Sequence, residues 1–167
     1  MGVLITTGDF VGTFAIPQNV YSDLDSYITK YEEGYLIDLL GAAFYTAFKA
    51  NLTNKVPVSQ RFLNIYNSFN EDYSNRIVKS KGMKEMLKGF IYFHYMTESQ
   101  YKATMQGLVV NSADTSRNMS PGNLFNYIND SVVSYKAIQD YIKRLHPSDY
   151  SDIVFNGICK EYSIPFF

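Results

Sequence analysis

The sequence predicts a mainly α-helical fold: a helical bundle with a long central loop or β-hairpin and short strand-like segments at both ends. Three observations lead to this prediction. Apolar residues recur with the helical period over several long segments, and all five prolines stand at the edges of those segments. The chain of 167 residues has the length of one domain. We therefore expect a single helical domain, residues 1–167, without internal repeats.

The N-terminal segment, residues 1–19, is expected to be an extended arm. Its run VLITTGDFVGTFAI, residues 3–16, is short and rich in β-branched side chains, with glycines at two bends. Such side chains favour strands, so we expect either an extended arm or one or two strands.

Residues 20–106 are expected to be helical. Gly34 and Gly41 interrupt the first segment without shifting the phase of its apolar positions, which predicts one long helix or two nearly collinear helices. The apolar positions define three helical segments: Ser22 to Phe48, Ser59 to about Tyr73, and about Lys81 to Met105.

The remaining chain is divided by one clear helix start. Residues 107–119, GLVVNSADTSRNM, lose the helical period and predict a long loop or a β-hairpin. The pair Ser120-Pro121 is typical of an N-cap followed by proline at the first helical position, so a long helix is expected over 120–146. Residues 147–167 are expected to be a C-terminal, partly strand-like arm with an apolar end.

Composition limits the classes of protein that this chain can belong to. The net charge of −1 argues against bulk binding of nucleic acid, and the single cysteine excludes an internal disulfide framework. No run approaches the roughly 20 apolar residues of a membrane span, and the N-terminus lacks the features of a secretory signal. We expect a soluble, intracellular chain. The 15 tyrosines and 12 phenylalanines indicate either an aromatic core or wide contact surfaces for other chains.

No pattern expected of an enzyme occurs, so we predict no catalytic residue, metal or cofactor. The sequence has no GxGxxG, GxxxxGK[ST], GxSxG, HExxH or CxxC motif. His94 lies on an apolar stripe and is interpreted as a hydrogen-bonded core histidine, whereas His146 ends a helix, where an imidazolium meets the negative end of the dipole. The acidic pairs Glu32-Glu33 and Glu71-Asp72 are interpreted as solvated turns, and Cys159 as structural or incidental.

One charge pattern is better formed. At ~100° per residue, Lys81, Lys84 and Lys88 fall within an arc of about 60° opposite the apolar side of their helix. The arc is either a solvated outer face or an electrostatic contact for an acidic partner surface or a nucleic-acid backbone.

Several motifs occur together in a characteristic order. They are Thr7-x-Asp9-x-x-Gly12-Thr13; YIxKYExxYLxxLLGxxFYxxF over 27–48; GMxxMLxxFIY over 82–92; the set Thr104, Gly107, Val109 and Asn111; and Ser120-Pro121. In this order they resemble the helical head–tail connector proteins of tailed phages. The likeness is greatest to the connector, or ring-protein, group of Bacteroidetes-infecting and crAss-like phages.

The resemblance implies a structural virion protein at the portal–tail junction, made in the cytoplasm of the host bacterium. Such proteins form a ring of roughly twelve subunits in head-to-tail contact. The implied partners are other copies of the chain, the portal protein, and a tail protein or second connector. DNA passes through the channel without sequence-specific binding, and no membrane, cofactor or enzymatic activity is implied. The alternative is a small helical adaptor that binds a partner protein or DNA through its basic helix face.

Two groups of residues are candidates for these contacts. The lysines would serve the adaptor, while residues 107–119 and the two termini would meet other subunits or the portal. The candidate interface residues are Lys81, Lys84, Lys88, Gly107, Asn111, Asp114, Arg117, Phe166 and Phe167.

Overall fold

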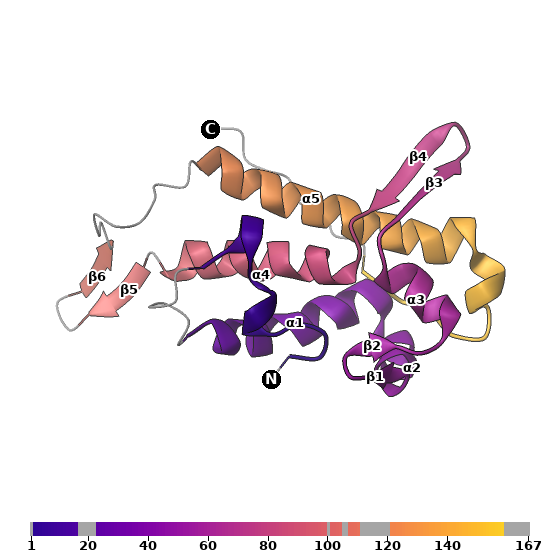
Figure 1. Ribbon diagram of the computed structural model, residues 1–167, viewed down its shortest axis with the longest axis horizontal. Helices are drawn as coiled ribbons and strands as arrows, with labels where there is room; N and C mark the ends of the chain where they lie inside the picture. Colours follow the sequence, from indigo (N-terminus) through magenta and orange to yellow (C-terminus); the bar gives the residue numbers. More distant parts are fainter. Residues whose placement is uncertain (1, 17–22, 100, 105–106, 111–120, 159–167) are drawn as a thin grey trace.

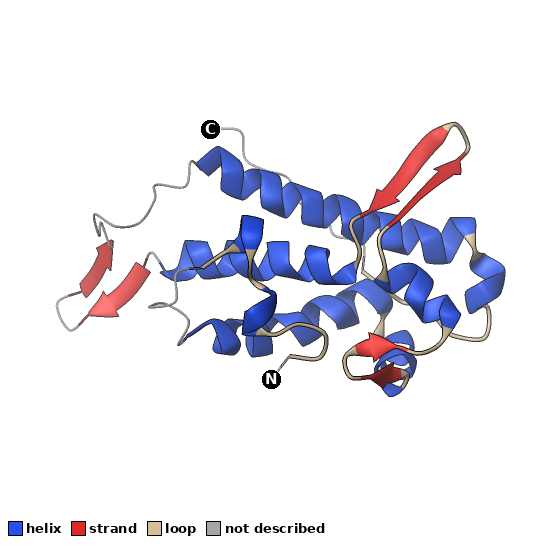
Figure 2. Ribbon diagram, viewed as in Figure 1, coloured by secondary structure: helices blue, strands red, loops and turns tan. Residues whose placement is uncertain are grey.

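The structure is a computed structural model that describes residues 2–16, 23–99, 101–104, 107–110 and 121–158. The mainly helical fold class is confirmed, since most described residues lie in helices (Figure 2). The α-helices of this part of the chain are α1 (Leu24–Leu40), α2 (Ala42–Ala50), α3 (Gln60–Tyr66), α4 (Met83–Ser99) and α5 (Pro121–Asp140). None of them is long and apolar enough to cross a membrane.

The three long helices form the body of the molecule. Figure 1 shows α4 between α1 and α5, and α4 contacts both neighbours. Each helix turns an apolar stripe inward, as amphipathic helices do. Aromatic rings fill the space between them: Phe90 of α4 stacks on Tyr35 of α1 at 4.3 Å and meets Tyr135 of α5 edge-on at 6.2 Å, both centroid to centroid. The core is therefore strongly aromatic.

The first expected helical segment consists of two helices that are not collinear. Figure 1 shows α1 along the molecule and α2 nearly end-on. Gly41 separates them with φ 81° and ψ 155°, a conformation that favours glycine. Its N–H donates to the Ile37 carbonyl at 2.7 Å and its carbonyl accepts from the Tyr45 N–H at 2.8 Å, so both helices keep their terminal hydrogen bonds. The spacing of apolar residues continues across Gly41, because both helices turn apolar residues towards the core. The sequence pattern therefore does not reveal the break.

Three small antiparallel hairpins complete the described fold (Figure 2). The expected helix to Tyr73 is wrong in its second half, because α3 ends at Tyr66 and a hairpin follows. The turn residues Asn54-Lys55 and Ser74-Asn75 all have positive φ, the geometry of type I′ hairpin turns. Neither pair contains the glycine that usually marks such a turn. The strand pairs are β1 (Leu52–Thr53) with β2 (Val56–Pro57), β3 (Phe69–Tyr73) with β4 (Arg76–Ser80), and β5 (Tyr101–Thr104) with β6 (Gly107–Val110).

The N-terminal arm does not form the strands that its β-branched residues suggest. Residues 2–16 instead make two short 3₁₀ turns, η1 (Thr7–Asp9) and η2 (Gly12–Phe14). Leu4, Ile5 and Phe10 are fully buried, so the arm belongs to the core. Its apolar side chains pack against helices, and its main chain is satisfied by side chains from elsewhere rather than by a neighbouring strand.

After α5 the chain makes a π-helical turn, η4 (Tyr141–Leu145), and a 3₁₀ turn, η5 (Pro147–Tyr150). No strand forms over residues 151–158, where a strand-like segment is expected. The main chain there bonds to helices instead: the Ile158 N–H donates to the Asp38 carbonyl at 2.6 Å, and the Tyr135 hydroxyl donates to the Ile158 carbonyl at 2.6 Å. The apolar end, residues 159–167, lies outside the described residues.

Candidate interaction surfaces

An acidic side chain on α1 binds the main chain of the N-terminal arm. Glu32 is 1% exposed and accepts hydrogen bonds from the N–H groups of Val3, Leu4 (2.7 Å) and Ile5 (2.9 Å). Burial raises the pKa of Glu32, although these hydrogen bonds act in the opposite direction. The interpretation of Glu32-Glu33 as a solvated turn is therefore wrong for Glu32. Its binding partners lie 27 or more residues away, so no local pattern indicates them.

A lysine binds two carbonyls of the same short segment. Lys55 lies in the β1–β2 turn, and its Nζ donates to the Gly2 carbonyl at 2.8 Å and the Ile5 carbonyl at 3.1 Å. We call Glu32 and Lys55 together the arm clamp. It satisfies three N–H groups and two carbonyls of residues 2–5, much as a strand neighbour does in a sheet.

Each of the three lysines predicted to share a face is paired with an acid. Lys81 precedes α4, which begins at Met83, and the Lys88 side chain is only 12% exposed. Lys81 Nζ lies 2.6 Å from Asp130 of α5, Lys84 Nζ lies 3.3 Å from Asp9 of the arm, and Lys88 pairs with Glu85. The expected basic face is thus largely neutralised by carboxylates from three parts of the chain.

The Asp9 pairing also organises the arm. Burial by itself raises the pKa of Asp9, but hydrogen bonds from Thr6 and the charge of Lys84 outweigh it, and the pKa is lowered. The Thr6 N–H and hydroxyl both donate to Asp9 Oδ2, at 2.8 and 2.9 Å. Lys84 therefore ties η1 to α4.

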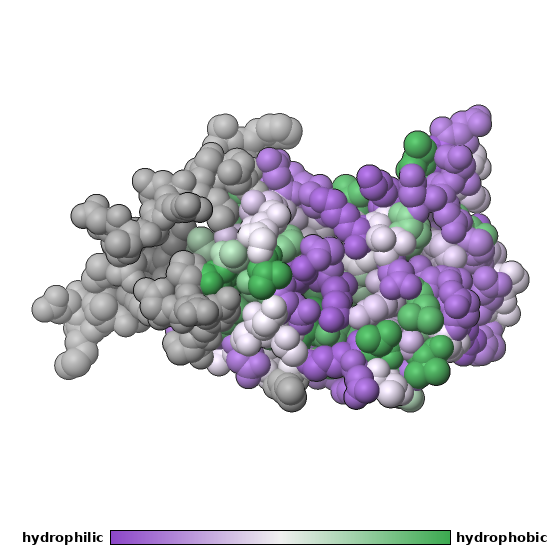
Figure 3. All heavy atoms as spheres, viewed as in Figure 1, coloured by the Kyte–Doolittle hydropathy of each residue, from purple (hydrophilic) through white to green (hydrophobic). Residues whose placement is uncertain are grey.

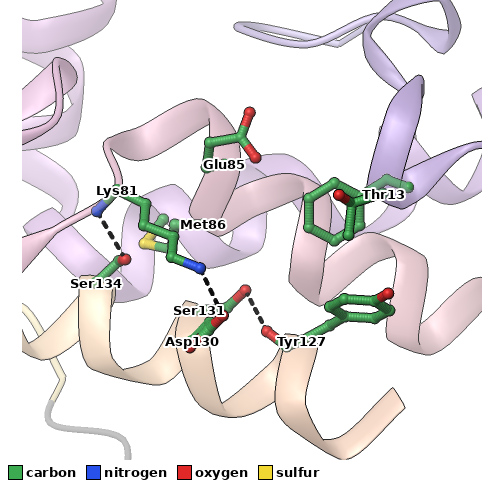
Figure 4. A pocket seen from close by; sticks show the side chains of 9 residues that line it. Thr13, Lys81, Glu85, Met86, Tyr127, Asp130, Ser131 and Ser134 are labelled. Carbon is green, nitrogen blue, oxygen red and sulfur yellow. Dashed lines mark hydrogen bonds and ion pairs between the residues drawn. The ribbon is translucent and has the colours of Figure 1, made fainter. Parts of the chain in front are cut away.

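A small pocket lies where η2 meets α4 and α5 (Figure 4). Its volume is about 130 Å³, below the roughly 300 Å³ at which ligand pockets usually begin. Lys81 pairs with Asp130 across it, and the Ser131 hydroxyl donates to the Tyr127 carbonyl at 3.0 Å. Its ionic groups are already bound to protein partners, so the pocket resembles a packing defect more than a ligand site. The lining residues are Thr13, Phe14, Lys81, Glu85, Met86, Tyr127, Asp130, Ser131 and Ser134.

Both histidines are held by structural contacts. His94 Nε2 lies 2.8 Å from the Tyr35 hydroxyl, and its ring stacks on Tyr31 with centroids 4.0 Å apart. The hydrogen bond is as expected, while a side chain 26% exposed places His94 at the edge of the core. His146 Nε2 lies 2.8 Å from Glu71 of β3, which joins the end of α5 to the β3–β4 hairpin. Glu71 is therefore an anchor for His146 rather than part of a solvated turn.

The β3–β4 hairpin has an attached face and an open face. On the attached face, the rings of Phe69 and Tyr141 lie 4.7 Å apart, and Arg76 pairs with Asp140 at 2.7 Å. In the described fold β3 and β4 pair only with each other, so each keeps an unpaired main-chain edge. Figure 3 shows hydrophobic surface on this hairpin among hydrophilic groups, and Ile77 of β4 is 66% exposed. The open face consists of Asn70, Asp72, Ile77 and Lys79.

The second candidate group is only partly visible. Gly107 is the first residue of β6 and pairs with Thr104 of β5. The other candidates of this group, Asn111, Asp114, Arg117, Phe166 and Phe167, lie outside the described residues.

Within the described ranges, no group of three or more His, Cys, Asp or Glu side chains could hold a metal ion. In the same part of the chain, no buried side-chain nitrogen or oxygen lacks a hydrogen-bond partner. No known protein family, curated protein or solved structure matches this chain.

Proposed function

We propose that this chain is a connector: a non-enzymatic subunit of a ring between the portal vertex of a phage capsid and the tail, with DNA passing through the channel. The resemblance described above suggests the class. The structural observation that carries the proposal is the placement of two hairpins, which extend away from the long helices at well-separated places (Figure 1). A closed ring needs two different surfaces on each subunit, because neighbours meet head to tail.

The β3–β4 hairpin supplies one such surface. Exposed strand edges bind other strands readily, and native proteins cover them or place charges on them. On the open face, Ile77 stands between the charged residues Asp72 and Lys79. A neighbouring subunit would cover the edge and the isoleucine and supply partners for both charges. The second contact would use the β5–β6 hairpin, which lies at the far end of the molecule in Figure 1.

The charged groups support a structural role. His94, His146 and the three lysines each connect secondary-structure elements or pair within one. Such groups stabilise an assembly subunit and are not arranged around a space that could hold a reacting molecule.

The alternative, an adaptor that binds through Lys81, Lys84 and Lys88, has less support. An acidic partner would have to displace Asp130, Asp9 and Glu85 from these lysines. Binding through them would weaken steeply with ionic strength, since its energy would come from charge neutralisation. A salt titration of any captured complex therefore separates the two candidates.

The test is to capture the tagged chain from the cells that make it and to image the complex by negative-stain electron microscopy. The proposal predicts a ring stacked on a larger, portal-like ring. Capture of one partner outside any ring, or of DNA that salt releases, would exclude it.

A matched pair of variants tests the hairpin surface. Ile77→Glu places a charge on the open face, whereas Val58→Glu changes a residue of nearly equal exposure, 65% against 66%, beyond β2. We expect rings from Val58→Glu and none from Ile77→Glu, with both variants folded by circular dichroism. Rings from both variants would show that the open face of β3–β4 is not a subunit contact.

A further inference from the structure

The first residues of the N-terminal arm are held through their backbone as well as through their side chains. The arm clamp makes five hydrogen bonds to main-chain atoms of residues 2–5: three to Glu32 and two to Lys55. None of these bonds involves a side chain of the arm. A carboxylate and an ammonium arranged in this way form a binding site for a peptide main chain, comparable to the edge of a sheet that accepts an added strand.

Apolar contacts provide selectivity for the arm sequence. Leu4, Ile5 and Phe10 are fully buried, and Phe14 meets the ring of Tyr92 on α4 at 5.6 Å. Peptide sites usually combine main-chain hydrogen bonds with pockets for particular side chains. Both features are present here, with residues 2–16 as the occupant.

The clamp accepts only glycine at its first position. A Cβ atom on Gly2 would lie 2.6 Å from Ile28 Cγ2, and nearer still to the Ile5 carbonyl oxygen and Glu32 Oε2. Two of these three obstacles belong to the clamp or the bound arm, so a methyl group would disturb the hydrogen bonds directly. A Gly2→Ala change is therefore a minimal way to weaken binding.

From this geometry we infer that the arm is exchangeable: the arm clamp of one chain binds residues 2–16 of a second copy in the same way that it binds its own. The second copy is the occupant because the arm itself is the sequence that fits the site. The inference rests on the proposed function, because assembly into a ring is what brings copies of the chain together. Exchange of an identical element reproduces every contact that the arm makes with its own chain. The free-energy cost of exchange is therefore mainly that of joining two chains.

The linker sets the geometry of exchange. Seven residues, 17–23, join the arm to α1, and seven residues span at most about 25 Å. The arm therefore reaches only a copy that packs close to α1. A neighbour in the proposed ring would have to pack within this distance of α1, and it would then provide a high local concentration.

A complementation experiment tests the exchange with purified full-length chains. One variant, Glu32→Ala with Lys55→Ala, has a damaged clamp and an intact arm. The other, Leu4→Asp with Ile5→Asp, has a damaged arm and an intact clamp. We expect each variant to be monomeric alone and a 1:1 heterodimer to form when they are mixed. Native mass spectrometry at about 0.1 mM detects the heterodimer. This high concentration is needed because binding between chains lacks the millimolar effective concentration of a tethered arm.

The control adds Gly2→Ala to the clamp-damaged variant. It should weaken the heterodimer about tenfold, the effect of forcing one methyl group into a packed site. Absence of a heterodimer between two folded variants, or a heterodimer that Gly2→Ala leaves unchanged, would overturn the inference.

A second measurement keeps the clamp and the arm intact in case a variant does not fold. Residues 17–22 are replaced by the recognition sequence of a site-specific protease, and the folded chain is cut there. The cut arm should stay bound during gel filtration and exchange for a labelled synthetic peptide of residues 2–16, but not for its Gly2→Ala form. Unfolding on cleavage, or an arm that never exchanges, would show that the arm is a fixed part of the core.

The outcomes separate this inference from the proposed function. Exchange between purified chains, with no ring in the captured complex, would leave the arm exchange standing and remove the connector proposal. Rings without any exchange would do the reverse.

Discussion

Replacing Glu32 should loosen the N-terminal arm and destabilise the whole chain. Glu32→Ala removes the acceptor for the Leu4 and Ile5 N–H groups, which belong to fully buried residues, and for the Val3 N–H. Each buried N–H left without a partner costs about 1–3 kcal/mol. Relief from holding a buried carboxylate offsets part of this cost. We expect the free energy of unfolding to fall by about 3 kcal/mol.

The two oxygens of Glu32 make a sharper prediction possible. Leu4 and Ile5 both donate to Oε1, and Val3 donates to Oε2. In Glu32→Gln the amide oxygen can stay at the Oε1 position and keep two of the three hydrogen bonds. Only the Val3 N–H then faces the NH2 group of the side-chain amide, which cannot accept a hydrogen bond. This variant should lose about 1–2 kcal/mol, clearly less than the alanine variant.

Urea unfolding followed by circular dichroism measures both losses, and amide hydrogen exchange of Val3, Leu4 and Ile5 locates them. Glu33→Ala is the control, because Glu33 is exposed and contacts only Tyr45 and Lys49 among the described side chains. It should leave the arm amides protected. If Glu32→Ala costs less than about 1 kcal/mol, or Glu32→Gln costs as much as Glu32→Ala, the reasoning about the arm clamp is wrong.

Two further predictions concern the helix break and the buried tyrosines. Gly41→Ala should lower the free energy of unfolding in urea by about 1–2 kcal/mol, because φ is 81° there and a Cβ would lie 2.8 Å from the Asn156 nitrogen. Gly34→Ala, in open space within α1, should raise it by about 0.5–1 kcal/mol. Equal effects of the two substitutions would contradict the assigned backbone. Burial raises the pKa of Tyr95 from 10.0 to about 12, so the folded chain keeps a proton that the unfolded chain loses. The stability that this provides is complete below pH 10.0 and is lost as the pH rises through about 12. Tyrosinate absorbance should show a group titrating near there that Tyr95→Phe removes, and its persistence in the variant would refute the assignment.

The sequence alone determined the features that depend on residues close together in the chain. The helical period located α4 and the long course of α5, and proline at the first helical position marked the start of α5 at Pro121. The expected helix to about Met105 is wrong at its end, because α4 ends at Ser99 and β5 begins at Tyr101. These signals are local because a helix places residues three and four apart on one face and satisfies its own main chain.

Features that depend on residues far apart in the sequence follow from the packing of the folded chain. The spacing of Lys81 and Lys84 predicts a shared face, but it says nothing of their partners, Asp130 and Asp9, which lie 49 and 75 residues away. For the same reason Glu32 looked like a surface residue, although the N-terminal arm covers it. Burial and pairing are properties of packed elements rather than of a local pattern, and a carboxylate has the same local sequence whether water or three backbone N–H groups surround it.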